Sequence, residues 1–154
     1  MRKALFTGTF DPYTIGHDSI VQRALSFMDE IVIAVVERNV RKQTLFSTEQ
    51  RVRMIQDLYA DEPRITVLPY GNLAVDFAKE QGAQFIIRGV RSTTDFVYEK
   101  ELAEINKRLS GIETILLLTE PELACVSSST VRELLSYGKD VTAFLPKGMK
   151  LIKK

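Results

Sequence analysis

Short apolar runs, rich in β-branched and aromatic residues, recur along the chain. They lie at residues 3–7 (KALFT), 31–36 (IVIAVV), 65–68 (ITVL), 84–87 (QFII) and 114–118 (TILLL). Runs of this length and composition predict five strands. Because they are almost continuously apolar instead of alternating with polar residues, we expect both faces of the sheet to be covered, as in a parallel sheet.

The segments between these runs show helical periodicity. Residues 17–28 (HDSIVQRALSFM) carry one apolar stripe at three- and four-residue steps, made by Ile20, Val21, Ala24, Leu25 and Met28. Residues 47–60 begin with Ser47 and have Gln50 three positions later, which is a capping-box pattern. The apolar face of this second helix is formed by Val52, Ile55, Leu58 and Tyr59.

Three more helices are expected, at residues 72–82, about 95–109 and about 129–137. The first ends at Gly82 and the last is followed by Gly138, and glycine is a frequent stop after a helix. Alternating strands and helices predict an α/β fold, a single doubly wound Rossmann-like domain with a five-stranded parallel sheet. A length of 154 residues fits one domain, which we place at residues 1–154.

Composition excludes some partners. The 21 Lys and Arg nearly balance the 20 Asp and Glu, so a net charge of +1 gives no general attraction to nucleic acid or membranes. The only cysteine, Cys125, cannot form an internal disulfide, which fits a reducing compartment. The N-terminal apolar run is too short for a signal peptide, and we expect a cytoplasmic protein. Cys125 is expected to be a small core residue, and residues 144–154 (FLPKGMKLIKK) to be a solvated basic tail.

Polar residues gather where the predicted strands end, the edge at which open α/β sheets bind ligands. They are Thr7, Gly8, Thr9, Asp11, Gly16 and His17 after the first strand; Asn39, Arg41 and Lys42 after the second; Arg88, Gly89 and Arg91 after the fourth; and Ser127, Ser128, Ser129 and Thr130 after the fifth. Glycine, hydroxyls, helix N-termini and cations suit phosphate. His17, the only histidine, stands at a helix start, where it can donate to a phosphoryl oxygen.

Each cluster alone has a plainer interpretation. The serines could be only a helix cap, and the cations could be ordinary surface charges. Asp11 is more simply explained as a carboxylate that organises its loop than as a metal ligand. What favours a phosphate site is that all four clusters fall at one edge of the predicted sheet.

Residues 7–17 (TGTFDPYTIGH) fit the pattern T/S-GxFDPxxxGH, in which TIGH at 14–17 resembles the T/HxGH element of the nucleotidyltransferase superfamily. A second element of that superfamily is a serine-rich helix start, here VSSSTVRELL at 126–135. Three further stretches resemble bacterial phosphopantetheine adenylyltransferases, so that the resemblance covers almost the whole chain. They are KQTLFSTEQRV at 42–52, IIRGVRSTTDFVYEKELAEINKRL at 86–109 and DVTAFLP at 140–146.

The resemblance implies transfer of AMP from ATP to 4'-phosphopantetheine, giving dephospho-coenzyme A and pyrophosphate in coenzyme A biosynthesis, with Mg²⁺ as cofactor. It implies a homohexamer and inhibition by coenzyme A, and the net charge of +1 adds the expectation of no nucleic-acid or membrane partner. It assigns catalysis to His17, Lys42 and Arg88, and the acceptor substrate to Thr9, Lys42, Ala74 and Arg88. It assigns ATP to Thr9, Phe10, His17, Gly89, Val90, Arg91, Glu99, Leu123, Ala124, Cys125, Val126, Ser127, Ser128 and Ser129.

Some positions depart from the family pattern. Thr7 stands where proline is common, Ile15 where asparagine is common, Leu123 where an aromatic residue is frequent and Ala74 where a larger apolar residue is usual. These changes are expected to touch adenine packing and the pantetheine pocket more than the phosphates. Tyr59, Phe77 and Phe96 could belong to subunit interfaces or to an ordinary core.

Three rival functions remain open at this stage. One is transfer of a nucleotide to another phosphate acceptor, such as nicotinate mononucleotide or a polyol phosphate. Another is a nucleotide-sensing or scaffold protein that keeps the fold without catalysis. The third, nucleic-acid binding, would need a basic face that the net charge does not supply.

Overall fold

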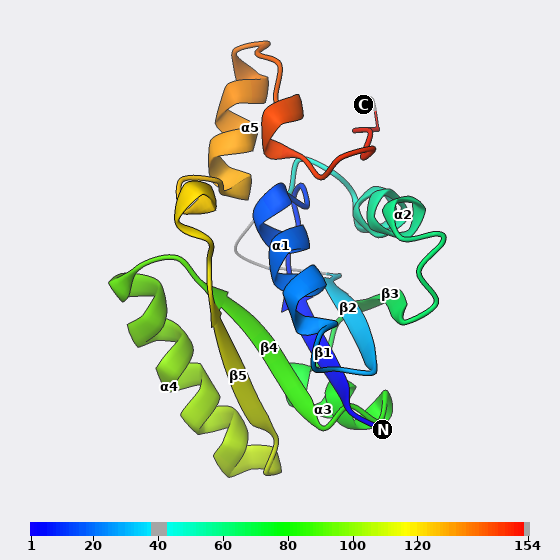
Figure 1. The fold of residues 1–154 in the computed structure, drawn as a ribbon, viewed down its shortest axis with the longest axis vertical. Coiled ribbons are helices and arrows are strands. Elements are labelled where there is room, and N and C mark those ends of the chain that lie inside the picture. The colour runs from blue at the N-terminus through cyan, green and yellow to red at the C-terminus, as the bar shows by residue number, and fades with distance from the viewer. Residues whose placement is uncertain (38–42, 153–154) are drawn as a thin grey trace.

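A single parallel sheet organises the molecule (Figure 1). The computed structural model describes residues 1–37 and 43–152. The strands pair in the order β3-β2-β1-β4-β5. Their bounds are β1 Lys3–Gly8, β2 Glu30–Val36, β3 Ile65–Tyr70, β4 Phe85–Val90 and β5 Glu113–Leu118. The prediction of a five-stranded parallel sheet with a doubly wound α/β fold is therefore confirmed.

The five predicted helices also form. Their bounds are α1 Ile15–Ala24, α2 Thr48–Leu58, α3 Ala74–Glu80, α4 Thr93–Ser110 and α5 Ser128–Ser136, with short 3-10 turns at Pro121–Leu123 and Thr142–Phe144. The capping box before α2 is confirmed, because Ser47 Oγ accepts from the Gln50 backbone N–H and Gln50 Oε1 accepts from the Ser47 backbone N–H. Gly82 and Gly138 have φ values of 70° and 69°, the left-handed conformation that ends a helix.

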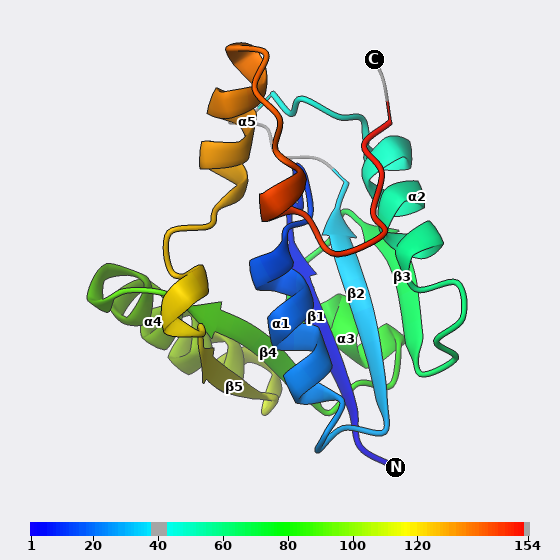
Figure 2. The same ribbon diagram turned by 45° about the horizontal axis from the view of Figure 1, so that its top comes forward.

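Helices cover both faces of the sheet, as the continuous apolar runs predict. The stripe on α1 packs with α2 against one face, where Phe6, Ile31 and Ile33 are buried. On the other face, α3 packs with Val75, Phe77 and Ala78 against Leu5, Val32 and Ile86. Helix α5 lies beyond the carboxyl ends of the strands, on the side of α1 (Figure 2). Loops from several strands therefore meet at the carboxyl edge of the sheet, below α5.

Two predictions about single segments are wrong. The C-terminal residues are not a solvated tail: Leu145 and Met149 are buried, and Leu151 packs against the same apolar clusters. Their apolar side chains outweigh the lysines between them, which keep their charges in water. Cys125 is exposed and not a core residue, because it lies in the turn that precedes α5 and no helix or strand of the described residues covers it.

The structure distinguishes the three aromatic residues that could belong either to the core or to subunit interfaces. Tyr59 and Phe77 are buried in the core clusters, whereas Phe96 on α4 is 45% exposed. Within residues 1–37 and 43–152, no helix has both the length and the apolar character needed to cross a membrane.

Candidate active site

A cavity of about 580 Å³ opens at the carboxyl ends of β1 and β4. These are neighbouring strands whose connections leave in opposite directions, the place where doubly wound folds bind ligands. Most of the predicted site residues line this cavity: Thr9, Phe10, His17, Arg88, Gly89, Arg91, Val126, Ser127, Ser128 and Ser129. The fold therefore brings together side chains from three separate stretches of sequence.

Other predicted residues lie elsewhere. Val90 is buried at the end of β4, Ala74 begins α3, and neither lines the cavity. The same holds for Leu123, Ala124 and Cys125, which lead into α5. Lys42, with Asn39 and Arg41, lies outside the described residues. The roles assigned to these residues stay predictions.

His17 is the third residue of α1 and takes part in the helix cap. Its Nδ1 accepts a hydrogen bond of 2.9 Å from the Thr14 backbone N–H, while the Thr14 hydroxyl accepts from the His17 backbone N–H. A backbone amide can only donate, so Nδ1 carries no proton and the neutral ring carries its proton on Nε2. The cap thereby fixes the tautomer and leaves Nε2–H as the ring's donor in a residue that lines the cavity.

Aromatic rings surround the imidazole. Tyr13 stacks on it with ring centroids 5.2 Å apart, and Phe10 meets it edge-on at 5.0 Å. Burial, followed by the positive charges of Arg88 and Arg91, lowers the pKa of His17 from its ordinary 6.5 to about 3. The histidine is therefore a neutral hydrogen-bond donor near pH 7.

Hydrogen bonds fix the guanidinium group of Arg88, which lines the cavity. Its Nε and one terminal nitrogen donate to the two carboxylate oxygens of Glu99, at 2.9 and 2.7 Å. The other terminal nitrogen donates to the Thr7 carbonyl and hydroxyl oxygens. Burial is the largest single influence and lowers the Arg88 pKa, but the hydrogen bond and charge of Glu99, together with Tyr70 and Tyr98, raise this pKa overall. Glu99, predicted to bind ATP, is itself buried and contacts Arg88 without lining the cavity.

The first turn of α5 is tied to the segment before α1. Ser127 caps the helix by accepting from the Thr130 backbone N–H, and the Ser128 hydroxyl donates to the Pro12 carbonyl oxygen at 2.7 Å. The N-termini of α1 and α5 therefore reach the same cavity, and both carry the partial positive charge that favours anions. The serines act both as a helix cap and as cavity lining.

Arg132 is a cavity residue that sequence reasoning missed. It donates to the Asp11 carbonyl oxygen at 2.8 Å and to the Ser129 hydroxyl at 3.1 Å. Its position three residues after Ser129 in a helix places both on one face, and this spacing was the signal available in the sequence. With Arg88 and Arg91, it makes three arginines in the cavity lining.

Asp11 organises backbone, as interpreted from the sequence, but its carboxylate binds the segment before α2 and not its own loop. Its two carboxylate oxygens accept from the Leu45 and Phe46 backbone N–H groups at 2.8 and 2.9 Å. Buried Arg51 supports the same region by donating to the carbonyl oxygens of Thr9 and Phe46. In the part of the chain that the structure describes, no group of three or more His, Cys, Asp or Glu side chains could hold a metal ion.

Gly8 leaves room for the ring of Phe10. A Cβ atom at Gly8 would lie 2.7 Å from Phe10 Cε1, closer than van der Waals contact allows. Phe10 itself has φ 53°, a left-handed conformation that is rare for a bulky residue. The absence of a side chain at Gly8 therefore lets this segment turn tightly beneath His17.

Comparisons with known proteins show the family of this chain. A model of the cytidylyltransferase-like family matches residues 5–134. The phosphopantetheine adenylyltransferase of Phocaeicola vulgatus is 60% identical over 98% of this chain and 99% of its own length. That of Bacteroides fragilis is 59% identical over 98% and 100%, and that of Flavobacterium johnsoniae is 44% identical over 99% and 100%.

Proposed function

Because this chain belongs to the cytidylyltransferase-like family and, within it, to the phosphopantetheine adenylyltransferases, we propose that it transfers AMP from ATP to 4'-phosphopantetheine. The products are dephospho-coenzyme A and pyrophosphate, a step of coenzyme A biosynthesis. The observation that carries the proposal is the meeting of the neutral donor His17, arginines and two helix N-termini in one cavity.

The chemistry needs positioning and charge more than proton transfer. A phosphate monoester has its second pKa at about 6, so the acceptor oxygen is already ionised near neutral pH and needs no base. His17 Nε2–H donates to an oxygen of the α-phosphate, where negative charge grows in the transition state. Being neutral and held by Thr14, the imidazole requires no rearrangement as that charge develops.

The remaining roles are those that the family resemblance implies. The acceptor phosphate is held by Arg88 and Lys42, with Thr9 beside it and Ala74 next to the pantetheine arm. Phe10, Gly89, Val90, Arg91 and Glu99 serve the ATP side, and residues 123–129 close over adenine and pyrophosphate. Arg91 and the N-terminus of α5 are supported in this role because both line the cavity beside His17.

Magnesium is proposed to enter with the nucleotide. Asp11 is the carboxylate that lines the cavity within the described residues, and both of its oxygens already accept backbone N–H groups. Phosphate oxygens and water therefore suit Mg²⁺ better than protein ligands here. When bound, the ion neutralises charge on the phosphates. Titrating Mg²⁺ at fixed ATP should give activity that follows the concentration of the Mg·ATP complex.

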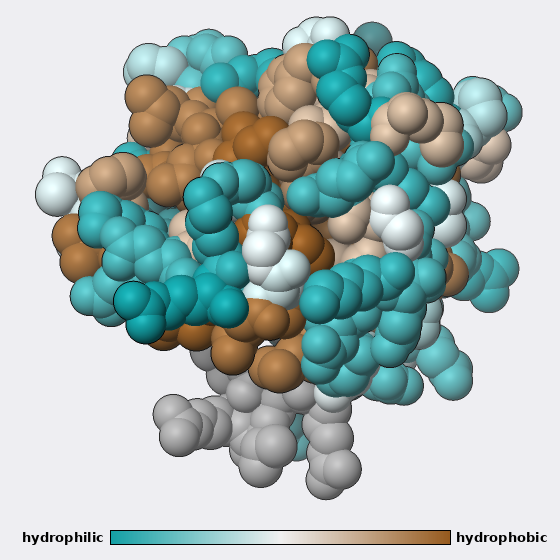
Figure 3. Space-filling model, turned by 90° about the horizontal axis from the view of Figure 1, so that it is seen from below, coloured by the Kyte–Doolittle hydropathy of each residue, from teal (hydrophilic) through white to brown (hydrophobic). Residues whose placement is uncertain are grey.

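Self-association into a homohexamer is the second part of the proposal. Helix α4 and strand β5 expose large apolar side chains: Phe96, Val97, Tyr98, Ile105, Leu109 and Leu118. Figure 3 shows apolar side chains reaching the surface on the side where α4 and β5 lie. Such exposure is typical of surfaces that other subunits cover. Light scattering coupled to size-exclusion chromatography should give six times the chain mass of 17.5 kDa.

Inhibition by coenzyme A and a cytoplasmic location complete the proposal. Coenzyme A contains both an adenylyl and a phosphopantetheine part, so it should compete with the two substrates, which initial-rate kinetics measure. The exposed thiol of Cys125 fits a reducing compartment. Cell fractionation would test the location.

The reaction is tested by measuring pyrophosphate release from ATP and Mg²⁺ with several acceptors. We expect release with 4'-phosphopantetheine and none with nicotinate mononucleotide or glycerol 3-phosphate. Release with one of the other acceptors would keep the chemistry but refute the proposed substrate. ATP binding without release for any acceptor would favour a nucleotide-binding protein without catalysis.

A further inference from the structure

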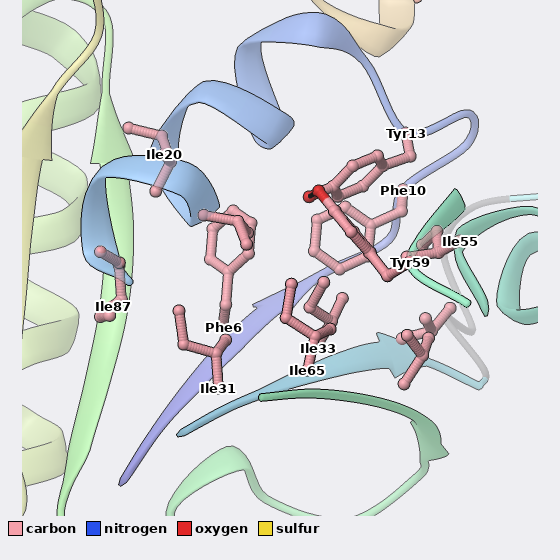
Figure 4. Close-up of a cluster of buried hydrophobic side chains, with 14 of the residues drawn as sticks. Phe6, Phe10, Tyr13, Ile20, Ile31, Ile33, Ile55, Tyr59, Ile65 and Ile87 are labelled. Atoms are coloured by element: carbon pink, nitrogen blue, oxygen red, sulfur yellow. Dashed lines mark hydrogen bonds between the residues drawn. The ribbon is translucent and has the colours of Figure 1, made fainter. Parts of the chain in front are cut away.

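Three polar side chains beside His17 form a hydrogen-bonded chain that the proposed mechanism does not use. The hydroxyl oxygens of Tyr13 and Tyr59 lie 2.6 Å apart, and the Tyr59 hydroxyl donates to Asp18 Oδ1 at 2.5 Å. Figure 4 shows the two hydroxyls meeting inside the apolar cluster next to the Phe10 ring. Tyr13, Tyr59 and Asp18 do not line the cavity, so any effect on catalysis must pass through another residue.

The direction of this chain follows from its last member. The Asp18 carboxylate can only accept, so Tyr59 uses its hydroxyl proton there and its oxygen is left to accept from Tyr13. Burial raises the pKa of both phenols above 10, so neither ionises near neutral pH. Both hydroxyls are buried, so removing the Tyr59 hydroxyl costs Tyr13 its hydrogen bond inside the core, whereas Tyr59 without Tyr13 would keep its bond to Asp18.

The hydrogen bonds of Tyr13, Tyr59 and Asp18 connect back to α1 and so hold the His17 imidazole from one side. Tyr13 stacks on His17 with an interplanar angle of 28°, and its far end is held by Tyr59, the C-cap residue of α2. Tyr59 returns to α1 through Asp18, the residue that follows His17. The Thr14 amide fixes the rotation of the imidazole through Nδ1, whereas the anchored phenol fixes the plane in which the ring lies.

We propose that Tyr13, Tyr59 and Asp18 are positioning residues, which hold the His17 ring so that Nε2–H points at the α-phosphate. The inference rests on the proposed adenylyl transfer for its kinetic consequence. A donor that stabilises developing charge must be held within about 0.5 Å and 10–20° of its productive geometry. Phe10 and Thr14 constrain the ring from other sides, so loosening the phenol weakens catalysis without abolishing it.

The first test compares Tyr59→Phe with Tyr137→Phe. The first removes one buried hydroxyl at nearly constant volume, and the second removes an exposed one on the far end of α5. For Tyr59→Phe we expect kcat to fall about fivefold, in line with one lost hydrogen bond, with the KM values for ATP and 4'-phosphopantetheine unchanged. Tyr137→Phe should match the wild type. A lowered kcat with equally raised KM values would mean a general disturbance of the site and would overturn the proposal.

A second readout is independent of activity. His17 is the only histidine in the chain, so imidazole ¹H–¹⁵N NMR gives one unambiguous set of signals. The ring protons of His17 should shift in Tyr59→Phe because the stacked phenol moves, and should stay in place in Tyr137→Phe. Unchanged His17 signals in a folded Tyr59→Phe protein would overturn the proposal. If wild-type protein showed no adenylyl transfer, the proposed function would fail while this readout still tested the positioning.

Asp18 provides a test that does not alter the core. It is partly exposed, so Asp18→Ala should fold, while losing the acceptor for Tyr59. Asp18→Asn keeps an acceptor oxygen and should recover most of the kcat lost in Asp18→Ala. Equal loss in both variants, with His17 signals as in the wild type, would show that Asp18 acts by charge and not by positioning.

Discussion

His17 serves two separable purposes, so substitutions can measure each alone. Its Nδ1 accepts from the Thr14 amide at 2.9 Å, which closes the cap of α1, and the residue lines the cavity with Nε2–H as the remaining donor of its ring. In α2 of the same chain, Gln50 closes an equivalent cap by accepting from the Ser47 amide at the same 2.9 Å. His17→Gln therefore keeps a cap acceptor while removing the imidazole, whereas His17→Ala removes both.

The magnitudes differ for the two purposes. Losing one preorganised donor to a transition-state oxyanion costs about 10²–10³ in kcat, or about 2.7–4 kcal/mol. Losing a cap acceptor costs about 1 kcal/mol of stability, and for a chain of this size that corresponds to about 2–4 °C in Tm. Both variants also lose the contact with Tyr13, so the difference between them isolates the cap.

The assay is adenylyl transfer followed by pyrophosphate release, with thermal unfolding measured on the same preparations. Both variants should lose at least a hundredfold in kcat, while His17→Ala should unfold about 2–4 °C below His17→Gln. A folded His17→Ala protein with near wild-type kcat would refute the role of the imidazole. Equal Tm values for Ala and Gln would refute the capping argument.

Three further outcomes follow from single features of the site. Because burial holds the folded pKa of His17 at about 3, below its ordinary 6.5, the NMR signals of His17 should not titrate above pH 5, and titration near 6.5 would contradict the neutral donor. The unfolded chain binds this proton more readily than the folded one, so the contribution of His17 to stability should decline as pH falls from 6.5 toward 3. Arg91→Ala should raise the KM for ATP about tenfold with little change in Tm. Arg53 is an exposed arginine that, like Arg91, has an Asp partner four residues on, so Arg53→Ala is the control and should change neither value; equal KM values for the two variants would remove Arg91 from the nucleotide site. Gly8→Ala should lower the free energy of unfolding by about 1–3 kcal/mol because the new Cβ would collide with Phe10. Denaturant unfolding tests this against Gly71→Ala, a substitution at an exposed glycine, and equal unfolding midpoints for the two variants would refute the clash.

Much of the cavity could be predicted because it follows from topology. The carboxyl ends of parallel strands meet at one edge, so His17, Arg88 and the serines before α5 come together once the strands are identified. The partners of these residues could not be predicted in the same way. Glu99 lies eleven residues from Arg88 on another element, and its carboxylate reaches the arginine only through the packing of α4 on β4.

The errors share a cause. Cys125 between Ala124 and Val126 has the local pattern of a core residue, yet burial depends on what packs against a side chain, and Cys125 is exposed. The C-terminal lysines suggest a solvated end, but Leu145 and Met149 find apolar surface left open beside α1, α2 and α5. Local composition cannot report on a neighbour that is distant in sequence.

The sequence by itself determined the strands, the helices, their caps and the edge at which chemistry gathers, because these depend on local hydrogen bonding and on the period of burial. Only the tertiary structure decided that His17 is neutral, through its burial beside Arg88 and Arg91, and which distant side chains hold it in place. Tyr13 and Tyr59 are 46 residues apart, and Tyr59 and Asp18 are 41 apart. Such contacts exist only after α1 and α2 have packed on one face of the sheet, since the free energy that selects them comes from burial shared between distant segments.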